Sequence, residues 1–346
     1  MLNLLKPNKL NPGDKVATVS LSWGGAGDDA FLWRYYQGKE RLQKQYGLEV
    51  VEMPNTLLGS EFLYNHPEKR AEDFMQAFSD KTIKGIISCI GGEESIRMLP
   101  YIDYNIIRGN PKVFTGYSDT TVAHFMCMKA GISSFYGASL MNDFAENVAV
   151  PEYTDYWIRK VLFSSETIGI VPCSNTYTSE YLEWSEDNKN KARKFRGNNG
   201  GYEVLQGEGT VSGRLIGGCL ETMDMLRGTP LFPDKDSFDN AILFLETSEE
   251  HPTVFAVSNF FRSLGAMSVL RRIKGIVFGK PEGSVLYEEY KTAIRKVLAE
   301  FGQENLPVIY NLSIGHNEPK FIVPFGAMAE INCDEKKFAV TEAAVR

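Results

Sequence analysis

The most constraining feature of this sequence is a continuous apolar run from Gly85 to Ile90, which ends in the pair Gly91-Gly92. A strand that is apolar on both faces is typical of a parallel sheet covered by helices on both sides. Segments of strand and helix character alternate around this run, which predicts an α/β domain with ligand sites at the carboxyl ends of its strands. The flanking elements are expected as strands at 16–21, 48–53, 112–116 and 134–137 and helices at 31–46, 68–80, 93–99 and 119–130.

The length of 346 residues suggests two domains. We expect an N-terminal α/β domain at 1–165, a connection or lid loop at 166–206, and a C-terminal domain at 207–346. The C-terminal domain is expected to be smaller and richer in β-structure. Its predicted strands lie at 209–216, 241–245, 275–279, 308–310, 327–333 and 338–340, and its predicted helices at 219–226, 252–270 and 290–301.

Composition excludes several classes of function. The net charge of -7 leaves no basic stripe with which to neutralise phosphates, so we expect no nucleic-acid partner. No apolar segment approaches the ~18 residues that span a bilayer, and residues 1–14 lack the apolar core of a signal peptide. The sequence therefore predicts a cytoplasmic protein with no membrane partner.

The cysteines and histidines do not form a metal or disulfide pattern. Five cysteines are an odd number, are widely spread and include no Cys-x-x-Cys pair, so reduced thiols are expected. The four histidines show no ligand spacing among themselves. We expect neither a metal site nor a cofactor.

A serine follows the predicted strand at 112–116. Gly116 allows a sharp turn, and helix-like sequence begins at Asp119, so Ser118 is expected at a strand-to-helix turn. A serine placed there projects from the sheet, and the backbone N–H groups after it point towards any bound oxygen. The Gly-x-Ser-x-Gly motif is only half matched because Thr120 replaces the last glycine. The alternative is that Ser118 caps the helix.

The second half of the chain offers partners for such a serine. Glu246 ends the apolar run at 241–245, and His316 lies on the loop after the strand at 308–310. Serine, histidine and a carboxylate can supply a nucleophile, a base and a group that orients the base. A solvated strand-end carboxylate and an ordinary loop histidine are the alternatives. Of the other histidines, His124 is expected to pack, since its six-residue offset turns it away from Ser118, and His251 is expected in a surface turn.

A polar, charged stretch at 175–199 carries one large aromatic residue, Trp184. Connections of this length in compact proteins tend to be functional or disordered. Trp184 is expected either to stack on a ligand or to anchor the loop to the body of the protein.

Several segments together resemble the LD-carboxypeptidase family of serine peptidases, and the likeness covers nearly the whole chain in order. They are Leu10 to Asp14, Arg70 to Asp73, Ile90 to Arg97, Gly116 to Thr121, Leu245-Glu246, Gly315-His316 and Pro324 to Gly326. The resemblance implies an N-terminal domain with class I glutamine amidotransferase-like, flavodoxin-like layering, a C-terminal swivelling domain and a homodimer. It implies a triad of Ser118, His316 and Glu246, with the backbone N–H groups of Gly92 and Asp119 as oxyanion donors.

Two branches of that family differ in substrate. One removes the terminal D-alanine from murein tetrapeptides, and the other, the microcin C immunity branch, cleaves a C-terminal amide-type bond in aminoacyl-nucleotide or peptidyl-nucleotide conjugates. The stretch from Ile90 to Ser95 resembles the second branch, where murein enzymes usually carry Arg-Gly-Gly-Tyr-Gly. The loop with Trp184 resembles it too, and implies that Trp184, together with Gly91, contacts the substrate. We therefore expect a carboxypeptidase of the immunity type.

Two other classes of function remain open from sequence. A non-catalytic protein could sequester the same ligands between its domains. A cysteine-dependent amidotransferase-like enzyme would need a thiol at the turn that Ser118 occupies, whereas Cys89 is expected within a strand and Cys127 within a helix.

Overall fold

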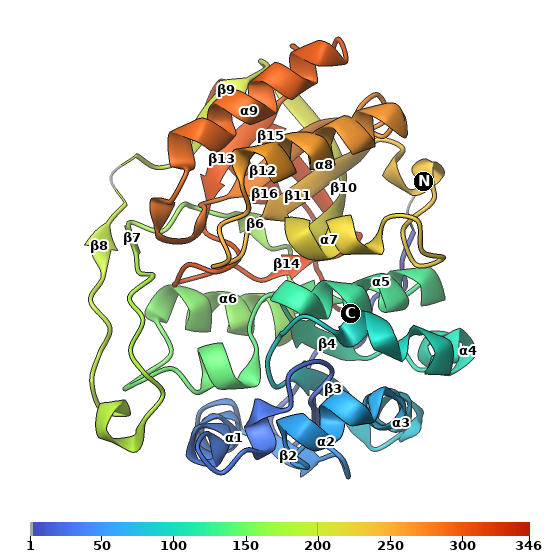
Figure 1. The fold of residues 1–346 in the computed structure, drawn as a ribbon, viewed down its shortest axis with the longest axis vertical. Helices are drawn as coiled ribbons and strands as arrows, with labels where there is room; N and C mark the ends of the chain where they lie inside the picture. Colours follow the sequence, from blue (N-terminus) through green and yellow to red (C-terminus); the bar gives the residue numbers. More distant parts are fainter. Residues whose placement is uncertain (1–2, 199) are drawn as a thin grey trace.

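Two β-sheets organise the computed structural model, which describes residues 3–198 and 200–346 (Figure 1). The first has six strands in the order β14-β5-β4-β3-β1-β2. These strands are β1 (Lys15–Val19), β2 (Glu49–Glu52), β3 (Ile83–Ser88), β4 (Val113–Gly116), β5 (Phe135–Tyr136) and β14 (Val323–Pro324). Neighbours among β1 to β5 pair in parallel, as the alternation of strand and helix predicts.

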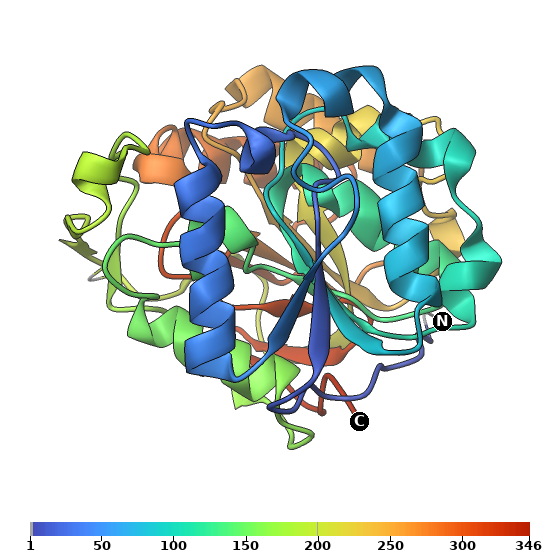
Figure 2. The ribbon, with the colours of Figure 1, turned by 90° about the horizontal axis from the view of Figure 1, so that it is seen from below.

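Helices cover this sheet on both sides, and Figure 2 shows α1 and α3 flanking β1 and β2. They are α1 (Leu32–Tyr46), α2 (Ser60–Asn65), α3 (Pro67–Ser79), α4 (Tyr104–Arg108), α5 (Thr121–Ala130) and α6 (Glu152–Leu162). Pro67 begins α3 at a position where its missing N–H costs nothing. Phe74, Ala77 and Phe78 are the residues of α3 that pack into the core, and all three are buried. The doubly covered sheet predicted from the apolar run at 85–90 is confirmed.

The predicted helix at 93–99 is wrong in type. Ser95–Tyr101 forms a 3₁₀ helix instead, and Pro100 lies inside it. Proline lacks the N–H that an α-helix needs and clashes with the preceding turn, which favours the tighter and shorter helix. Other short helical turns occupy Gly25–Gly27, Ser118–Thr120, Leu140–Phe144, Glu186–Asn188, Lys235–Phe238 and Glu282–Ser284.

The second sheet has eight strands in the order β6-β16-β15-β10-β11-β12-β13-β9. They are β6 (Gly169–Ile170), β9 (Glu203–Gln206), β10 (Thr210–Cys219), β11 (Ala241–Glu246), β12 (Gly275–Gly279), β13 (Val308–Leu312), β15 (Met328–Asn332) and β16 (Lys337–Val340). β10 to β13 run in parallel, and the predicted hairpin of β15 and β16 is confirmed. Its helices are α7 (Leu220–Leu226), α8 (Val254–Ala266) and α9 (Tyr287–Glu300).

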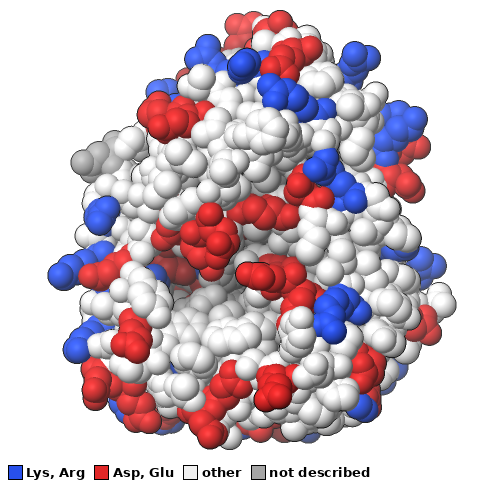
Figure 3. Space-filling view, in the orientation of Figure 1, with Lys and Arg blue, Asp and Glu red and all other residues white. Residues whose placement is uncertain are grey.

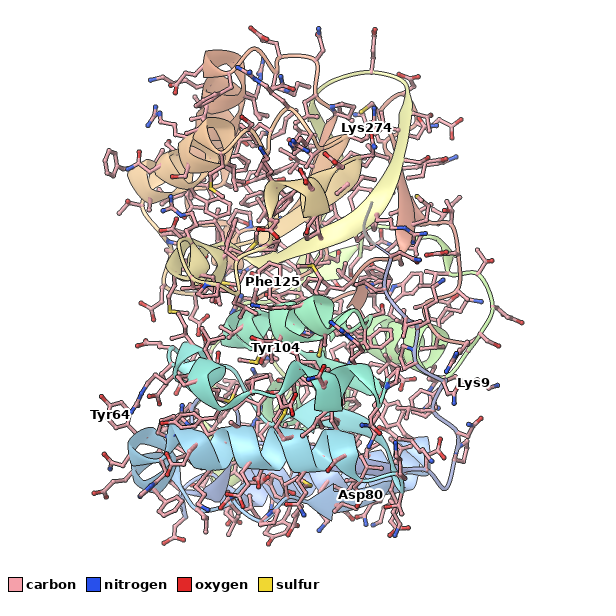
Figure 4. All side chains as sticks on the ribbon, turned by 90° about the vertical axis from the view of Figure 1, so that its right-hand side faces the viewer. Lys9, Tyr64, Asp80, Tyr104, Phe125 and Lys274 are labelled. Atoms are coloured by element: carbon pink, nitrogen blue, oxygen red, sulfur yellow. The ribbon has the colours of Figure 1, made fainter. Side chains whose placement is uncertain are left out.

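The two halves meet along α5, which lies between the sheets in Figure 1. Figure 4 places Phe125 where α5 faces the second half, and its ring contacts Phe325 with centroids 6.0 Å apart. Thr121 Oγ1 accepts a hydrogen bond from the backbone N–H of Cys219 at 3.1 Å. This packing brings the carboxyl end of β4 close to that of β11, which are the two strand ends that the sequence singled out.

The predicted connection or lid loop contains a short strand pair, β7 (Thr176–Tyr177) with β8 (Arg196–Gly197). In Figure 1 it forms a long arm at the edge of the molecule that joins the two halves. Asn199, the last residue of the predicted loop, lies outside the described residues. In the described parts of the chain, no helix combines the length and apolar character needed to cross a bilayer.

Candidate active site

Ser118 lies at the turn that the sequence predicted, directly after β4 and before α5. Its φ angle is +63°, a left-handed conformation that non-glycine residues rarely adopt. The N-cap of α5 is Thr120 and that of the preceding 3₁₀ turn is Tyr117, so the alternative role of Ser118 as a helix cap is wrong. A strained, partly exposed serine at a strand-to-helix turn is instead the geometry of a nucleophile elbow.

The Gly91-Gly92 loop packs directly against this turn. A Cβ atom on Gly91 would lie 2.9 Å from Ser118 Cβ and 3.4 Å from the backbone nitrogen of Asp119. The carbonyl of Gly91 accepts a hydrogen bond from the N–H of Trp23 at 3.1 Å, which fixes the loop. Only a residue without a side chain therefore allows β3 and β4 to present their loops side by side.

Asp119 is buried, and its hydrogen bonds hold the backbone after Ser118 in place. Its carboxylate accepts from Ser22 Oγ at 2.6 Å and from the N–H of Ser95 at 2.8 Å. Its carbonyl accepts from Ser95 Oγ at 2.9 Å. Three loops, those after β1, β3 and β4, are thus tied together at the carboxyl edge of the first sheet.

Glu246 and His316 form a hydrogen-bonded pair. Glu246 ends β11 with its side chain fully buried, and His316 Nδ1 donates to Glu246 Oε2 at 2.7 Å. Gly315 has a φ angle of +84°, and a Cβ atom there would collide with the Glu246 carboxylate. A glycine is required so that the histidine loop can pass over the carboxylate.

The charges of this pair are mutually stabilising. Burial alone would lower the pKa of His316, but the charge and hydrogen bond of Glu246, with the charge of Glu249, outweigh it and raise that pKa to about 9. Burial alone would raise the pKa of Glu246, but the opposing effect of His316 prevails and the pKa is lowered. The carboxylate is therefore ionised at neutral pH.

Tyr136, which sequence reasoning missed, connects the two halves of the site. Its hydroxyl donates a hydrogen bond to Glu246 Oε1 and accepts one from the N–H of Ser118 at 3.0 Å. Burial, followed by the charge of Glu246, raises the pKa of Tyr136 well above its usual value, so the phenol stays a neutral donor. The signal available in the sequence was its place at the end of a strand neighbouring β4.

The other ring nitrogen of His316 contacts a second carboxylate. His316 Nε2 lies 3.2 Å from Glu249 Oε2. Within the described residues no hydrogen bond joins Ser118 Oγ to His316. The Tyr117 ring packs edge-on against the imidazole, with centroids 5.0 Å apart, and carries the ammonium of Lys320 on it at 3.8 Å.

A cavity of about 430 Å³ opens beside Ser118 and His316 between the two halves, where Figure 3 shows a hollow with acidic side chains on its rim. Gly91, Gly92 and Trp184 also line it. Glu246 and Asp119 lie behind this surface, Glu246 hydrogen-bonded to His316 and Asp119 next to Ser118 in the chain. All the residues that the sequence proposed for the site therefore converge on one cavity or directly behind it.

Trp184 is both a loop anchor and part of the cavity wall. It stacks against Trp23 with ring centroids 6.5 Å apart, and the guanidinium carbon of Arg34 lies 4.3 Å from its ring centroid. Its ring also meets Phe31 edge-on, with centroids 6.0 Å apart. The expectation that Trp184 anchors the loop agrees with these contacts, and its stacking on a ligand stays a prediction.

Buried charged residues that the sequence did not reveal form ion pairs with the loop that carries Trp184. Arg193 pairs with Glu146 and lies 4.0 Å from Glu318. Lys320, fully buried, lies 2.6 Å from Glu318 and 3.0 Å from Asp143. Nothing in the periodicity of these segments signals the network, since its members are far apart along the chain.

The competing histidines and cysteines lie elsewhere. His124 is buried, bonds to Ser134 Oγ at 2.9 Å and to the carbonyl of Gly116 at 2.8 Å, and burial lowers its pKa to about 3. His251 lies 3.4 Å from Glu282. Cys89 and Cys127 are fully buried, away from the turn. Across residues 3–198 and 200–346, no cluster of three or more potential ligands could hold a metal ion.

Comparison with known proteins agrees with this geometry. Residues 16–137 match the LD-carboxypeptidase N-terminal domain, and residues 212–331 match the LD-carboxypeptidase C-terminal domain. The chain belongs to the LD-carboxypeptidase family. It is accordingly a serine-type carboxypeptidase, with the parallel-sheet first domain and β-rich second domain that the sequence resemblance implied.

Individual LD-carboxypeptidase relatives are similar over nearly their whole length. The chain is 29% identical to the microcin C7 self-immunity protein MccF of Escherichia coli, over 89% of this chain and 88% of that protein. It is 27% identical to a probable murein peptide carboxypeptidase of Bacillus subtilis, over 98% and 95%. The structure of an MccF-like protein of Streptococcus pneumoniae in complex with AMP superposes with a TM-score of 0.87, at 32% identity over 95% and 99% of the chains. A structure of MccF in complex with aspartyl sulfamoyl adenosine gives a TM-score of 0.85, at 28% identity over 99% and 100%.

Proposed function

We propose that this carboxypeptidase hydrolyses the C-terminal amide-type bond of an aminoacyl-nucleotide or peptidyl-nucleotide conjugate, with Ser118, His316 and Glu246 as its triad. The observation that carries the proposal is the His316–Glu246 pair, which shares one cavity with the strained Ser118 turn. Trp184, which lines the same cavity, is the proposed stacking partner for a base. The relatives whose structures hold AMP and aspartyl sulfamoyl adenosine support this class of substrate.

The mechanism follows from the geometry. Ser118 Oγ attacks the acyl carbon while His316 Nε2 takes its proton, and Glu246 fixes the tautomer of the imidazole through Nδ1. The N–H of Ser118 is engaged by Tyr136, which leaves the N–H groups of Gly92 and Asp119 as the proposed oxyanion donors. His316 then returns the proton to the leaving group, and water hydrolyses the acyl-enzyme.

The direct test is Ser118→Ala in purified protein, assayed on aspartyl or glutamyl sulfamoyl adenosine by mass spectrometry. We expect kcat to fall by about 10⁴ or more, because removing a triad member leaves only binding and oxyanion stabilisation. Unchanged turnover would refute the role of Ser118. Stoichiometric binding by the wild-type protein without any product would favour the sequestering alternative.

Murein tetrapeptides are the second candidate substrate, favoured by the similarity to the Bacillus subtilis protein over nearly the full chain. An L,D-tetrapeptide assayed beside the sulfamoyl conjugates distinguishes the two, since a higher kcat/KM for the peptide would move the chain to the murein branch. The division at residues 165 and 207, the cytoplasmic location and the homodimer remain predictions from sequence.

A further inference from the structure

The nitrogen that must receive the proton of Ser118 has another partner in this structure. His316 Nε2 lies 3.2 Å from Glu249 Oε2, while Nδ1 is held by Glu246. An imidazole that contacts carboxylates through both nitrogens is stabilised in its protonated form. In that form it cannot act as a general base, so the arrangement seen here is a resting one.

The charges around the ring agree with this conclusion. Carboxylates outnumber cations near His316, and they hold its pKa at about 9, against the effect of burial. At neutral pH most of the imidazole is therefore charged. The titratable and charged groups that face or influence it are Glu246 on β11, Glu249 on the loop after β11, Glu282 on its 3₁₀ turn, Tyr117 before α5 and Lys320 before β14.

Of the two carboxylates on the ring, only Glu249 is free to move. The Glu246 side chain is fully buried and is held by Tyr136 as well, whereas 64% of the Glu249 side chain is exposed. Within the described chain no Lys or Arg nitrogen lies within 4 Å of the Glu249 carboxylate. A positively charged group on a ligand in the cavity would therefore have no lysine or arginine to displace from Glu249.

Among the described residues that line the cavity, both arginines already have partners. Arg193 is paired with Glu146, and Arg34 is committed to Asn147 and to the face of Trp184. The lining includes the further carboxylates Glu180, Glu282 and Glu318. Glu318 is 4% exposed and its Oε1 pairs with Lys320, while its Oε2 has no hydrogen-bond partner among the described residues. A cavity with this balance of charge favours a cationic ligand over an anionic one.

We propose that Glu249 is a specificity-determining residue that pairs with a positively charged side chain on the acyl part of the substrate, and that this exchange of partners frees His316 Nε2 for Ser118. The proposal rests on the proposed function and deepens it. Substrates with a basic aminoacyl group would free the base that activates Ser118, while acidic ones would leave Glu249 on the imidazole and be repelled by its charge. The selectivity and the resting state of the base would then depend on the same carboxylate.

The test uses three conjugates that share the sulfamoyl adenosine and the free α-amino group. The lysyl and norleucyl side chains share a four-carbon stem and differ in the terminal ammonium, whereas the glutamyl side chain is shorter and ends in a carboxylate. For the wild-type protein we expect kcat/KM to be about tenfold higher for the lysyl than for the norleucyl conjugate, and lowest for the glutamyl one. Glu249→Gln should abolish the preference for lysyl, and Glu250→Gln, an exposed neighbour, is the matched control that should retain it.

The pH profile provides a readout that a merely structural role would not change. Removing the charge of Glu249 lowers the pKa of His316, so the rise of kcat/KM with pH should move to lower pH in Glu249→Gln. A shift of one unit would raise norleucyl hydrolysis at pH 7 by about tenfold, since the neutral fraction of the base rises tenfold. The same shift should be measurable by NMR titration of His316 without any substrate.

The outcomes separate this inference from the proposed function. An unchanged His316 titration, or a persistent lysyl preference in Glu249→Gln, overturns the role of Glu249 even if Ser118→Ala is inactive. Binding to the Ser118→Ala protein by calorimetry covers the case of slow turnover, where equal affinity for all three conjugates would also overturn it. Hydrolysis and binding of none of them would refute the proposed function as well.

Discussion

The two walls of the cavity are held in place by different kinds of interaction. One of them, the strand-end wall, carries Ser118 and His316 on the loops after β4 and β13, where they are hydrogen-bonded to Tyr136 and to the buried Glu246 behind them. The other is the arm between β7 and β8, where Trp184 and Arg193 are held by ring contacts and ion pairs. The contrast teaches that the reacting groups lie where sheet geometry fixes them, while the groups proposed for recognition lie on a segment able to vary independently.

Glu246→Gln should give the largest change and tests the strand-end wall. Gln can keep the space of the carboxylate but cannot stabilise the imidazolium, and its amide favours the wrong tautomer of His316. We expect kcat to fall by about 10⁴ with KM little changed. Steady-state kinetics measure this, with thermal unfolding as the control for folding. A loss of less than tenfold would show that the buried carboxylate is only structural.

Tyr136→Phe should have an intermediate effect on the same wall. It removes a hydrogen bond to a charged carboxylate and the acceptor for the Ser118 N–H, a loss of about 2 kcal/mol in transition-state stabilisation, or roughly 30-fold in kcat. Without the phenol the Glu246 charge is less well stabilised. The kcat profile against pH is the discriminating measurement, and a variant with lower stability but wild-type kcat would limit Tyr136 to packing.

Trp184→Ala, a substitution in the other wall, should have the smallest effect. Loss of one stacking face costs roughly 1.4 kcal/mol, so we expect KM for a nucleoside conjugate to rise about tenfold with kcat nearly unchanged. Trp184→Phe retains an aromatic face and should lie closer to the wild type. A tenfold fall in kcat would contradict the proposed difference between the walls, because the arm would then contribute to the chemical step as well as to binding.

The strand-end wall was also the part that sequence could predict. Strand ends are marked by apolar runs that stop at a glycine or a polar residue, as at Gly91 and Glu246, and parallel sheets bring such ends to one edge. The central strands of both sheets followed from the same periodicity. The edge strands β6, β9 and β14 were not predicted, and the helix that contains Pro100 is 3₁₀ instead of α-helical. The family resemblance then selected which strand-end residues to join.

The remainder of the site depends on contacts across the chain that leave no local pattern. Tyr136 looks like any aromatic strand residue until its hydroxyl is seen between Ser118 and Glu246. Arg193 lies in a polar stretch, and its partner Glu146 is 47 residues away. Trp184 packs against Arg34 and also lines the cavity, and no local pattern in the sequence signals either contact.

The pairing of β14 with β5 has a consequence for how the protein is made. β14 closes an edge of the first sheet, although more than 180 residues separate it from β5 along the chain, and His316 precedes it by seven. During synthesis the N-terminal half can collapse early, but the edge of β5 stays open until the segment that carries β14 has been made and folds back onto it. A protein that lacked this segment would expose the edge of β5 to aggregation.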